Sequence, residues 1–199
     1  MDHYFTIEKN GEAEFKDRGS RFLAYAFPLK DPEIFKKQLN HLKKEHPKAV
    51  HHCFAYRIGV TGEIFRANDD GEPAGTAGKP ILGQIDSKQV TNTAVIVVRY
   101  FGGSLLGVPG LINAYKTVTS LVLQTIPIIK KHVEVPHILH FGFEDMNQVL
   151  QLCRLCQCTI TEQELQLFPY IKVNIPVSRL EEVLFRLKEM RNVDFSVLV

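Results

Sequence analysis

The stretch N-D-D-G-E-P-A-G-T-A-G-K-P-I-L-G, from Asn68 to Gly83, organises this chain. Its first half combines carboxylates, glycines and prolines, and it cannot be regular helix or strand, because glycine permits positive φ while proline fixes φ. In the second half, apolar residues fall at helical spacing, and we expect Thr76 to be the N-cap of that helix. A loop specified this closely favours a functional site over a spacer.

The overall composition is that of an ordinary globular protein. Hydrophobic residues make up 45% of the 199 residues and charged residues 23%, and the formal net charge of +2 is too mild to indicate a nucleic-acid binder by charge alone. No apolar run approaches the roughly 20 residues of a membrane span, and the N-terminus does not resemble a secretory signal. The four cysteines are unevenly spaced and do not suggest a disulfide framework. We therefore expect a cytoplasmic protein without membrane association.

Strands and helices are expected to alternate around the opening stretch. Asp31-Pro32 is a typical helix start, and Asn10-Gly11 is a typical hairpin dipeptide. The run 93–101 is continuous and rich in β-branched residues, so we expect it to be a central strand.

A second glycine-rich loop, Gly102 to Gly110, also leads into an expected helix. Helix N-termini attract anions, and Lys79 and Arg99 could add charge nearby. Neither loop has the spacing of a P-loop or of a dinucleotide fingerprint. The alternative is that the glycines only permit tight strand-to-helix turns.

The composition changes at Val135-Pro136-His137. Beyond it, the pattern predicts strand, helix, two strands, helix and a final strand at 193–199, the β-α-β-β-α-β order of a ferredoxin-like domain. Polar residues at Asp145 to Gln148 and at Ser178 to Glu181 indicate helix capping boxes. We therefore predict an α+β protein with two α/β-sandwich domains, residues 1–135 and 136–199.

The acidic loop has two interpretations. Asp69, Asp70 and Glu72 could bind Mg²⁺, which prefers oxygen ligands, or could cap the following helix. In the strand that begins at His51, His51 and Cys53 share one face and His52 takes the other, so His51 and Cys53 do not form a catalytic dyad. Packed side chains are the favoured interpretation for Cys53.

The remaining cysteines and the basic residues give weaker signals. Cys153, Cys156 and Cys158 resemble half of a metal site, but a structural zinc site needs four ligands, so we expect buried thiols and no metal. Arg57, Arg99 and neighbouring aromatic residues could stack nucleic-acid bases, or could be ordinary residues at the edge of the core.

Several of these motifs together resemble the YigZ/Impact family. They are H-H-C-F-A-Y-R-I-G at 51–59, D-D-G-E-P-A-G-T-A-G-K-P-I-L at 69–82 and R-Y-F-G-G-S-L-L-G at 99–107, with G-S-R-F at 19–22 and E-H-P at 45–47. The resemblance implies an N-terminal domain like domain 2 of ribosomal protein S5 and a C-terminal ferredoxin-like domain. It also implies a role in translation, since eukaryotic Impact regulates translation by competing for a ribosome-associated activator of a stress kinase.

The second loop departs from the family pattern at three positions. Leu106 stands where lysine is usual, Pro109 where glycine is usual and Asn113 where arginine is usual. The loss of two cations weakens the case for anion binding at this loop.

We therefore expect a non-enzymatic, translation-associated protein without cofactor that binds RNA, the ribosome or a translation-related protein through a groove between the two loops. The alternative is a hydrolase-like enzyme that uses the acidic loop with a metal or as acid and base. The candidate binding residues are His51, His52, Arg57, Asp69, Asp70, Glu72, Thr76, Lys79, Arg99, Tyr100, Gly102 and Gly103.

Overall fold

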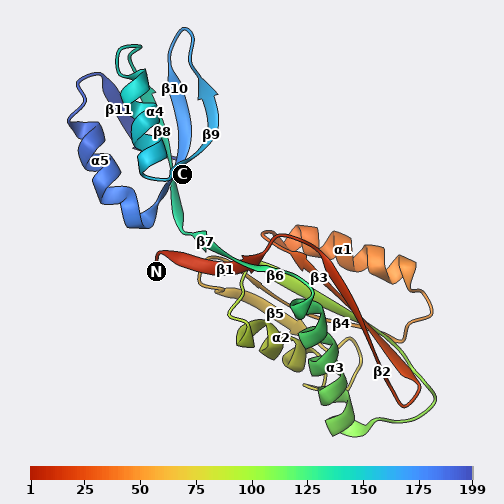
Figure 1. The fold of residues 1–199 in the computed structure, drawn as a ribbon. Coiled ribbons are helices and arrows are strands. Elements are labelled where there is room, and N and C mark those ends of the chain that lie inside the picture. Colours follow the sequence, from red (N-terminus) through yellow and green to blue (C-terminus); the bar gives the residue numbers. More distant parts are fainter. Residues whose placement is uncertain (199) are drawn as a thin grey trace. The chain divides into compact units, whose positions relative to one another are not determined.

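The chain divides into two compact units, and the computed structural model describes residues 1–198. One unit is Tyr4–Lys131, and the other joins Met1–His3 with the chain from His132 onward. The expected boundary at 135/136 lies a few residues beyond this division. Along the chain, the elements up to this division are β1 (His3–Ile7), β2 (Gly11–Asp17), β3 (Ser20–Pro28), α1 (Pro32–Glu45), β4 (His51–Ile58), β5 (Ile64–Asn68), α2 (Gly78–Ser87), β6 (Thr93–Tyr100), α3 (Gly107–Gln124) and β7 (Ile128–His132) (Figure 1).

Five of these strands form one antiparallel sheet in the order β2-β3-β6-β4-β5, and β1 pairs with β7 in a separate two-stranded sheet. As predicted, the β-branched run forms the central strand, β6, which is buried along almost its whole length. A strand covered on both faces reads as a continuous apolar run, because neither face is exposed to water.

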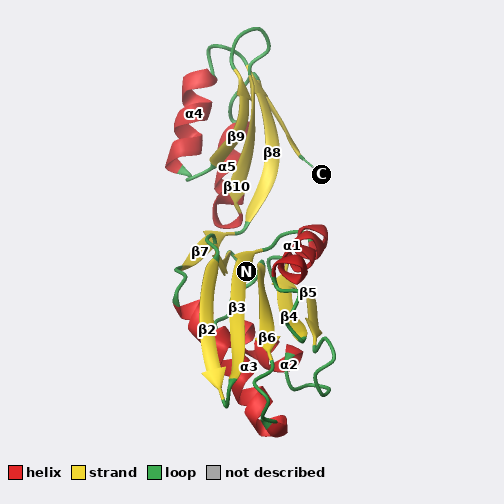
Figure 2. Cartoon of the chain, turned by 90° about the vertical axis from the view of Figure 1, so that its right-hand side faces the viewer, coloured by secondary structure: helices red, strands yellow, loops and turns green. Residues whose placement is uncertain are grey.

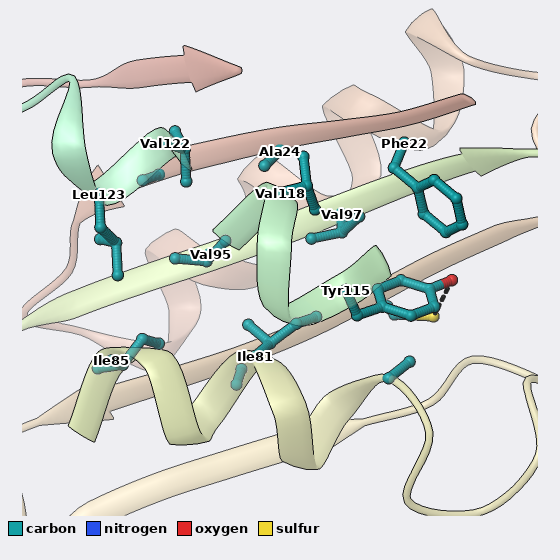
Figure 3. Close-up of a cluster of buried hydrophobic side chains, with 14 of the residues drawn as sticks. Phe22, Ala24, Ile81, Ile85, Val95, Val97, Tyr115, Val118, Val122 and Leu123 are labelled. Atoms are coloured by element: carbon teal, nitrogen blue, oxygen red, sulfur yellow. Dashed lines mark hydrogen bonds between the residues drawn. The ribbon is translucent and has the colours of Figure 1, made fainter. Parts of the chain in front are cut away.

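Helices cover both faces of the five-stranded sheet. Val95 and Val97 of β6 pack in a cluster with α2 and α3, whereas Ile96 and Val98 pack with α1. The helices α2 and α3 therefore cover one face and α1 covers the other (Figure 1). Figure 3 shows the first cluster, with Tyr115 of α3 beside Phe22 of β3 at one end. The α1 helix starts as predicted, because the Asp31 side chain accepts a hydrogen bond from the Glu33 N–H at 2.9 Å.

The strand directions bring the two glycine loops to the same end of the sheet. β4 is antiparallel to both β5 and β6, so the ends of β5 and β6 lie beside the start of β4, where His51 pairs with Arg99. The loops that follow β5 and β6 therefore both leave the lower end of the sheet in Figure 2.

The second unit contains a four-stranded antiparallel sheet in the order β11-β8-β10-β9. The helices α4 and α5 contribute to the apolar cluster of this unit. The predicted final strand includes Val199, which lies outside the described residues. The elements are β8 (Glu134–Phe141), α4 (Met146–Leu155), β9 (Thr159–Glu164), β10 (Tyr170–Pro176), the 3₁₀ helix η1 (Val177–Arg179), α5 (Leu180–Lys188) and β11 (Val193–Val197).

Three local predictions were wrong. Asn10-Gly11 does not close a hairpin; β2 instead turns into β3 at Arg18-Gly19, where both residues have positive φ. The expected capping boxes of α4 and α5 are also absent, since neither the N-cap Asp145 nor the N-cap Arg179 makes a side-chain cap bond.

In residues 1–198, no helix is both long and apolar enough to cross a bilayer.

Candidate functional site

Asp69 folds the first glycine loop around its own carboxylate. Its Oδ1 accepts hydrogen bonds from the backbone N–H of Ala77 at 2.9 Å and of Gly78 at 2.8 Å, and its Oδ2 accepts one from Gly75 at 2.9 Å. Burial alone would raise the pKa of Asp69, but the three N–H donors together lower it. Asp69 therefore acts as a remote cap for the start of α2.

The prediction that Thr76 caps α2 was wrong. The helix begins at Gly78, its N-cap residue is Ala77, and the Thr76 hydroxyl instead donates to the Pro73 carbonyl at 2.7 Å. The start of α2 also presses on the end of β5, because a Cβ at Gly78 would lie 2.6 Å from the backbone nitrogen of Asn68. Glycine at this position permits the contact between helix and strand.

Asp70 attaches the loop to the start of β4. Its Oδ2 accepts from the His52 backbone N–H at 2.7 Å, and its carbonyl oxygen accepts from His51 Nδ1 at 2.8 Å. The Lys43 ammonium lies 3.5 Å from the Asp70 carboxylate. Both side-chain oxygens of Asp70 therefore lie near protein donors or cations.

His51 and His52 face opposite sides of the sheet, as the strand pattern predicts. The His51 ring lies against the loop, with Nε2 3.8 Å from the Glu72 carboxylate. The His52 side chain is buried on the side of α1, and this burial lowers its pKa, assisted by the nearby charges of Lys43 and His46 and opposed by Asp70. The two histidines therefore do not act on one ligand.

Glu72 points into the protein and forms a buried ion pair with Arg99 of the central strand. Its Oε1 lies 2.6 Å from Arg99 Nη1 and accepts a hydrogen bond from the Tyr115 hydroxyl at 2.7 Å. Arg99 Nη2 also lies 3.5 Å from Ser20 Oγ, while no residue in 1–198 gives Arg99 Nε a hydrogen-bond partner. The charge of Arg99 is therefore balanced inside the protein and is not presented to an external anion.

Cys53 lies beside this ion pair. Its thiol is 3.0 Å from the Asp69 carbonyl oxygen and 3.2 Å from the Tyr115 hydroxyl, the contact drawn as a dashed line from Tyr115 in Figure 3. Burial raises the pKa of Cys53 and also that of Tyr115. Both groups are therefore neutral at physiological pH, and the thiol is not poised as a nucleophile.

The candidates taken from the sequence did not include Tyr115, whose hydroxyl donates to Glu72. A tyrosine in an aliphatic stripe is a usable signal, because a buried hydroxyl usually finds a polar partner. Ser20 was also missed as a contact of Arg99. It belongs to the G-S-R-F motif, but its partner lies far along the chain.

The second loop is held against the turn between β2 and β3. A Cβ on Gly102 would lie 1.8 Å from the carbonyl carbon of Gly19, and the Gly102 N–H donates to Ser20 Oγ at 3.2 Å. Gly103 has a φ of +85° and open space around it. Leu105, by contrast, is 84% exposed. This loop therefore presents an apolar side chain from a firmly held backbone.

Two candidate residues lie away from the loops. Arg57 lies at the far end of β4, where it pairs with Asp86 and donates to the Gly62 carbonyl at 2.8 Å. Tyr100 lies on the face of the sheet that α1 covers, and its hydroxyl oxygen is 2.9 Å from His46 Nδ1. Lys79 is exposed on the first turn of α2. In the part of the chain that the structure describes, no group of three or more His, Cys, Asp or Glu residues is arranged to hold a metal ion.

The sequence and the fold both have relatives among known proteins. The protein-family model of the Impact N-terminal domain matches residues 18–123 of the sequence. The IMPACT family member YigZ of Escherichia coli is 30% identical over 181 residues, which cover 90% of this chain and 89% of YigZ. YvyE of Bacillus subtilis is 38% identical over 131 residues, which cover 66% of this chain but only 60% of YvyE. The crystal structure of a hypothetical protein matches with a TM-score of 0.73 and 27% identity, covering 100% of this chain and 98% of the other.

Proposed function

Because the chain belongs to the Impact family, we propose that it is a non-enzymatic regulator of translation that docks a protein of the translation apparatus through its two glycine loops. One observation carries this proposal. The three carboxylates of the first loop are bound by the protein itself, while the second loop presents apolar side chains to solvent. The loops therefore form a preformed surface rather than a set of free acids and bases.

The fold supports the same assignment. The element order β-α-β-β-α-β and the sheet order β11-β8-β10-β9 support a ferredoxin-like C-terminal domain. The five-stranded sheet with α1 on one face and α2 and α3 on the other supports an N-terminal domain like domain 2 of ribosomal protein S5. In this proposal the boundary between the two domains lies along the chain at residues 135 and 136.

The distribution of charge favours a protein partner over RNA. Binding to a nucleic-acid backbone relies on lysine and arginine side chains that neutralise phosphates. Around the two loops, the Arg99 guanidinium is buried and paired with Glu72, while Lys79 and Lys116 are exposed. The usual family cations at positions 106 and 113 are replaced by Leu106 and Asn113.

Exposed apolar side chains give the surface its affinity for a protein. Phe101 is 48% exposed, Leu105 84% and Val108 51%. All three lie in the eight residues that end in the first turn of α3. Clustered apolar side chains on a surface commonly mark a site of protein interaction. They would fill a complementary pocket of the partner and act as its anchor residues.

The enzyme alternative receives less support from the contacts. A general acid, a general base or a metal ligand needs a carboxylate that is free to exchange a proton or bind a cation. Asp69 accepts three backbone N–H bonds, and Glu72 is held by Arg99 and Tyr115. Lys79, Gly102 and Gly103 remain candidate contacts of the docking surface.

The proposal is tested by measuring binding of the full chain to purified bacterial ribosomes, to ribosomal proteins stripped of RNA and to protein-free ribosomal RNA, each across a salt series. We expect binding to the protein-containing samples with a shallow dependence on salt. Leu105→Ser should weaken that binding by about tenfold or more, the effect of losing an anchor residue.

Leu167→Ser is the matched control, because Leu167 is 82% exposed on the other unit and should leave binding unchanged. Binding to protein-free RNA that weakens steeply with salt, and that Leu105→Ser does not alter, would replace this proposal with the RNA-binding alternative.

A further inference from the structure

The C-terminal end of α4 has the hydrogen-bond pattern of a Schellman motif. The backbone N–H of Cys158 donates to the Cys153 carbonyl at 2.8 Å, and that of Gln157 donates to the Arg154 carbonyl at 3.2 Å. Gln157 occupies the left-handed position of the motif, with a φ of 57°. In this motif the side chains at the positions that Cys153 and Cys158 occupy here frequently contact each other.

Both cysteines belong to the apolar cluster of this unit. The interaction between their side chains lowers the pKa of Cys153 and raises that of Cys158. Cys153 is 2% exposed, whereas Cys158 is partly exposed and immediately precedes β9. The motif therefore places the buried Cys153 beside the more accessible Cys158.

We propose that Cys153 and Cys158 form a reversible dithiol–disulfide pair that reacts with small disulfides such as oxidised glutathione. The proton of Cys158 passes to the Cys153 thiolate, and the accessible Cys158 thiolate formed in this way attacks one sulfur of the small disulfide, forms a mixed disulfide and releases the first small thiolate. The Cys153 thiolate then attacks the Cys158 sulfur, forms the intramolecular bond and releases the second small thiolate. Two electrons pass from the protein to the small disulfide, and the two thiol protons pass to solvent.

Cys156 is the natural comparison within the same turn. It is 2% exposed, as Cys153 is, and burial raises its pKa. It occupies the C-cap position between the two contacting residues of the motif, so its side chain is not the one that the Schellman geometry brings to Cys158. Oxidation therefore selects the pair 153 and 158 and ties the end of α4 to the start of β9.

The test uses the full chain in buffers with increasing ratios of oxidised to reduced glutathione, followed by intact mass measurement and peptide mapping. The wild-type protein should lose two free thiols and about 2 Da without a glutathione adduct. Cys156→Ala should behave in the same way. Cys153→Ala should instead trap glutathione on Cys158, because the second sulfur is missing.

The proposal is overturned if the wild-type chain keeps four free thiols, if it accumulates the glutathione adduct without closing, or if Cys156→Ala prevents closure. Circular dichroism establishes that each variant retains the wild-type helix content. Cys158→Ala provides a second arm, in which the three remaining thiols should stay reduced over the whole range of buffers. An internal disulfide in Cys158→Ala would overturn the assignment of the pair.

Discussion

Oε1 of Glu72 lies 2.6 Å from Nη1 of Arg99, and the two side chains are only 3% and 6% exposed. The Arg99 guanidinium also lies over the rings of Phe22 and Phe101, with its central carbon 5.4 Å and 5.7 Å from their centres. A buried ion pair carries a desolvation cost that its geometry must offset. The bond from Tyr115 contributes to that compensation and joins α3 to the same carboxylate. The first loop is therefore held in place by the core of the domain.

Glu72→Gln should lower the free energy of unfolding by about 3 kcal/mol, because the buried guanidinium of Arg99 loses its counter-charge. Urea denaturation followed by circular dichroism measures this change. The control Glu63→Gln removes an exposed carboxylate and should unfold at nearly the wild-type midpoint. In the double variant Glu72→Gln/Arg99→Met, part of the lost stability should return; a double variant that loses the sum of both single effects would contradict the ion-pair explanation.

Asp69→Ala should lower the free energy of unfolding by about 2 kcal/mol, because three backbone N–H groups at the start of α2 lose their acceptor. Native-state hydrogen exchange should show the loss first at Gly75, Ala77 and Gly78. Asp69→Asn retains an oxygen acceptor and should cost less. Equal costs for the two variants would show that the capping bonds are not the cause.

The Asp69 carboxylate should also contribute to acid sensitivity. Its pKa is lowered in the folded state, so its contribution to stability is complete above the unfolded pKa of about 3.9 and is lost as pH falls through the folded value. The stability difference between wild type and Asp69→Asn should therefore shrink in this acidic window. Denaturant titrations at a series of pH values below about 5 test it. A difference that stays constant down to the lowest pH would refute the assignment.

His52 should make stability depend on pH near neutrality. Its folded pKa lies below the unfolded value of about 6.5, so the unfolded state binds a proton first as pH falls. Stability should therefore be complete above about pH 6.5 and should decline below it. His52→Gln should flatten this decline, whereas His41→Gln, at an exposed position of α1, should retain the wild-type profile. A steeper decline in His52→Gln would mean that the sign is wrong.

Two glycine substitutions should have opposite effects. Gly102→Ala introduces a Cβ that overlaps the backbone of Gly19, and it should lower the free energy of unfolding by roughly 2–3 kcal/mol. Gly83→Ala lies in α2 with no atom within 4 Å of the new Cβ, and it should raise that free energy by roughly 0.5–1 kcal/mol. Thermal unfolding of both variants measures the contrast. A neutral Gly102→Ala would mean that the second loop is not held against the turn.

The sequence predicted element types well wherever one local pattern decides them. The Asp31-Pro32 start of α1 and the central position of β6 both follow from residues close together in the chain. Turn and cap assignments were less successful. The Asn10-Gly11 dipeptide has the residues of a tight hairpin, but β1 pairs with β7, so the chain does not turn back there. Turn chemistry permits a hairpin, and the pairing of more distant strands decides whether one forms.

By itself, the sequence determined that two glycine loops lead into helices, because glycine, proline and helical spacing act over a few residues. Only the tertiary structure decided what the carboxylates of the first loop do. The side chain that caps α2 is Asp69 and not Thr76. Glu72 contacts Arg99 and Tyr115, which lie 27 and 43 residues further along the chain. Such contacts depend on strand register and helix packing, since these alone bring distant residues within hydrogen-bonding distance. The loop is therefore fixed from the core, and its exposed neighbours form the surface that we assign to a partner.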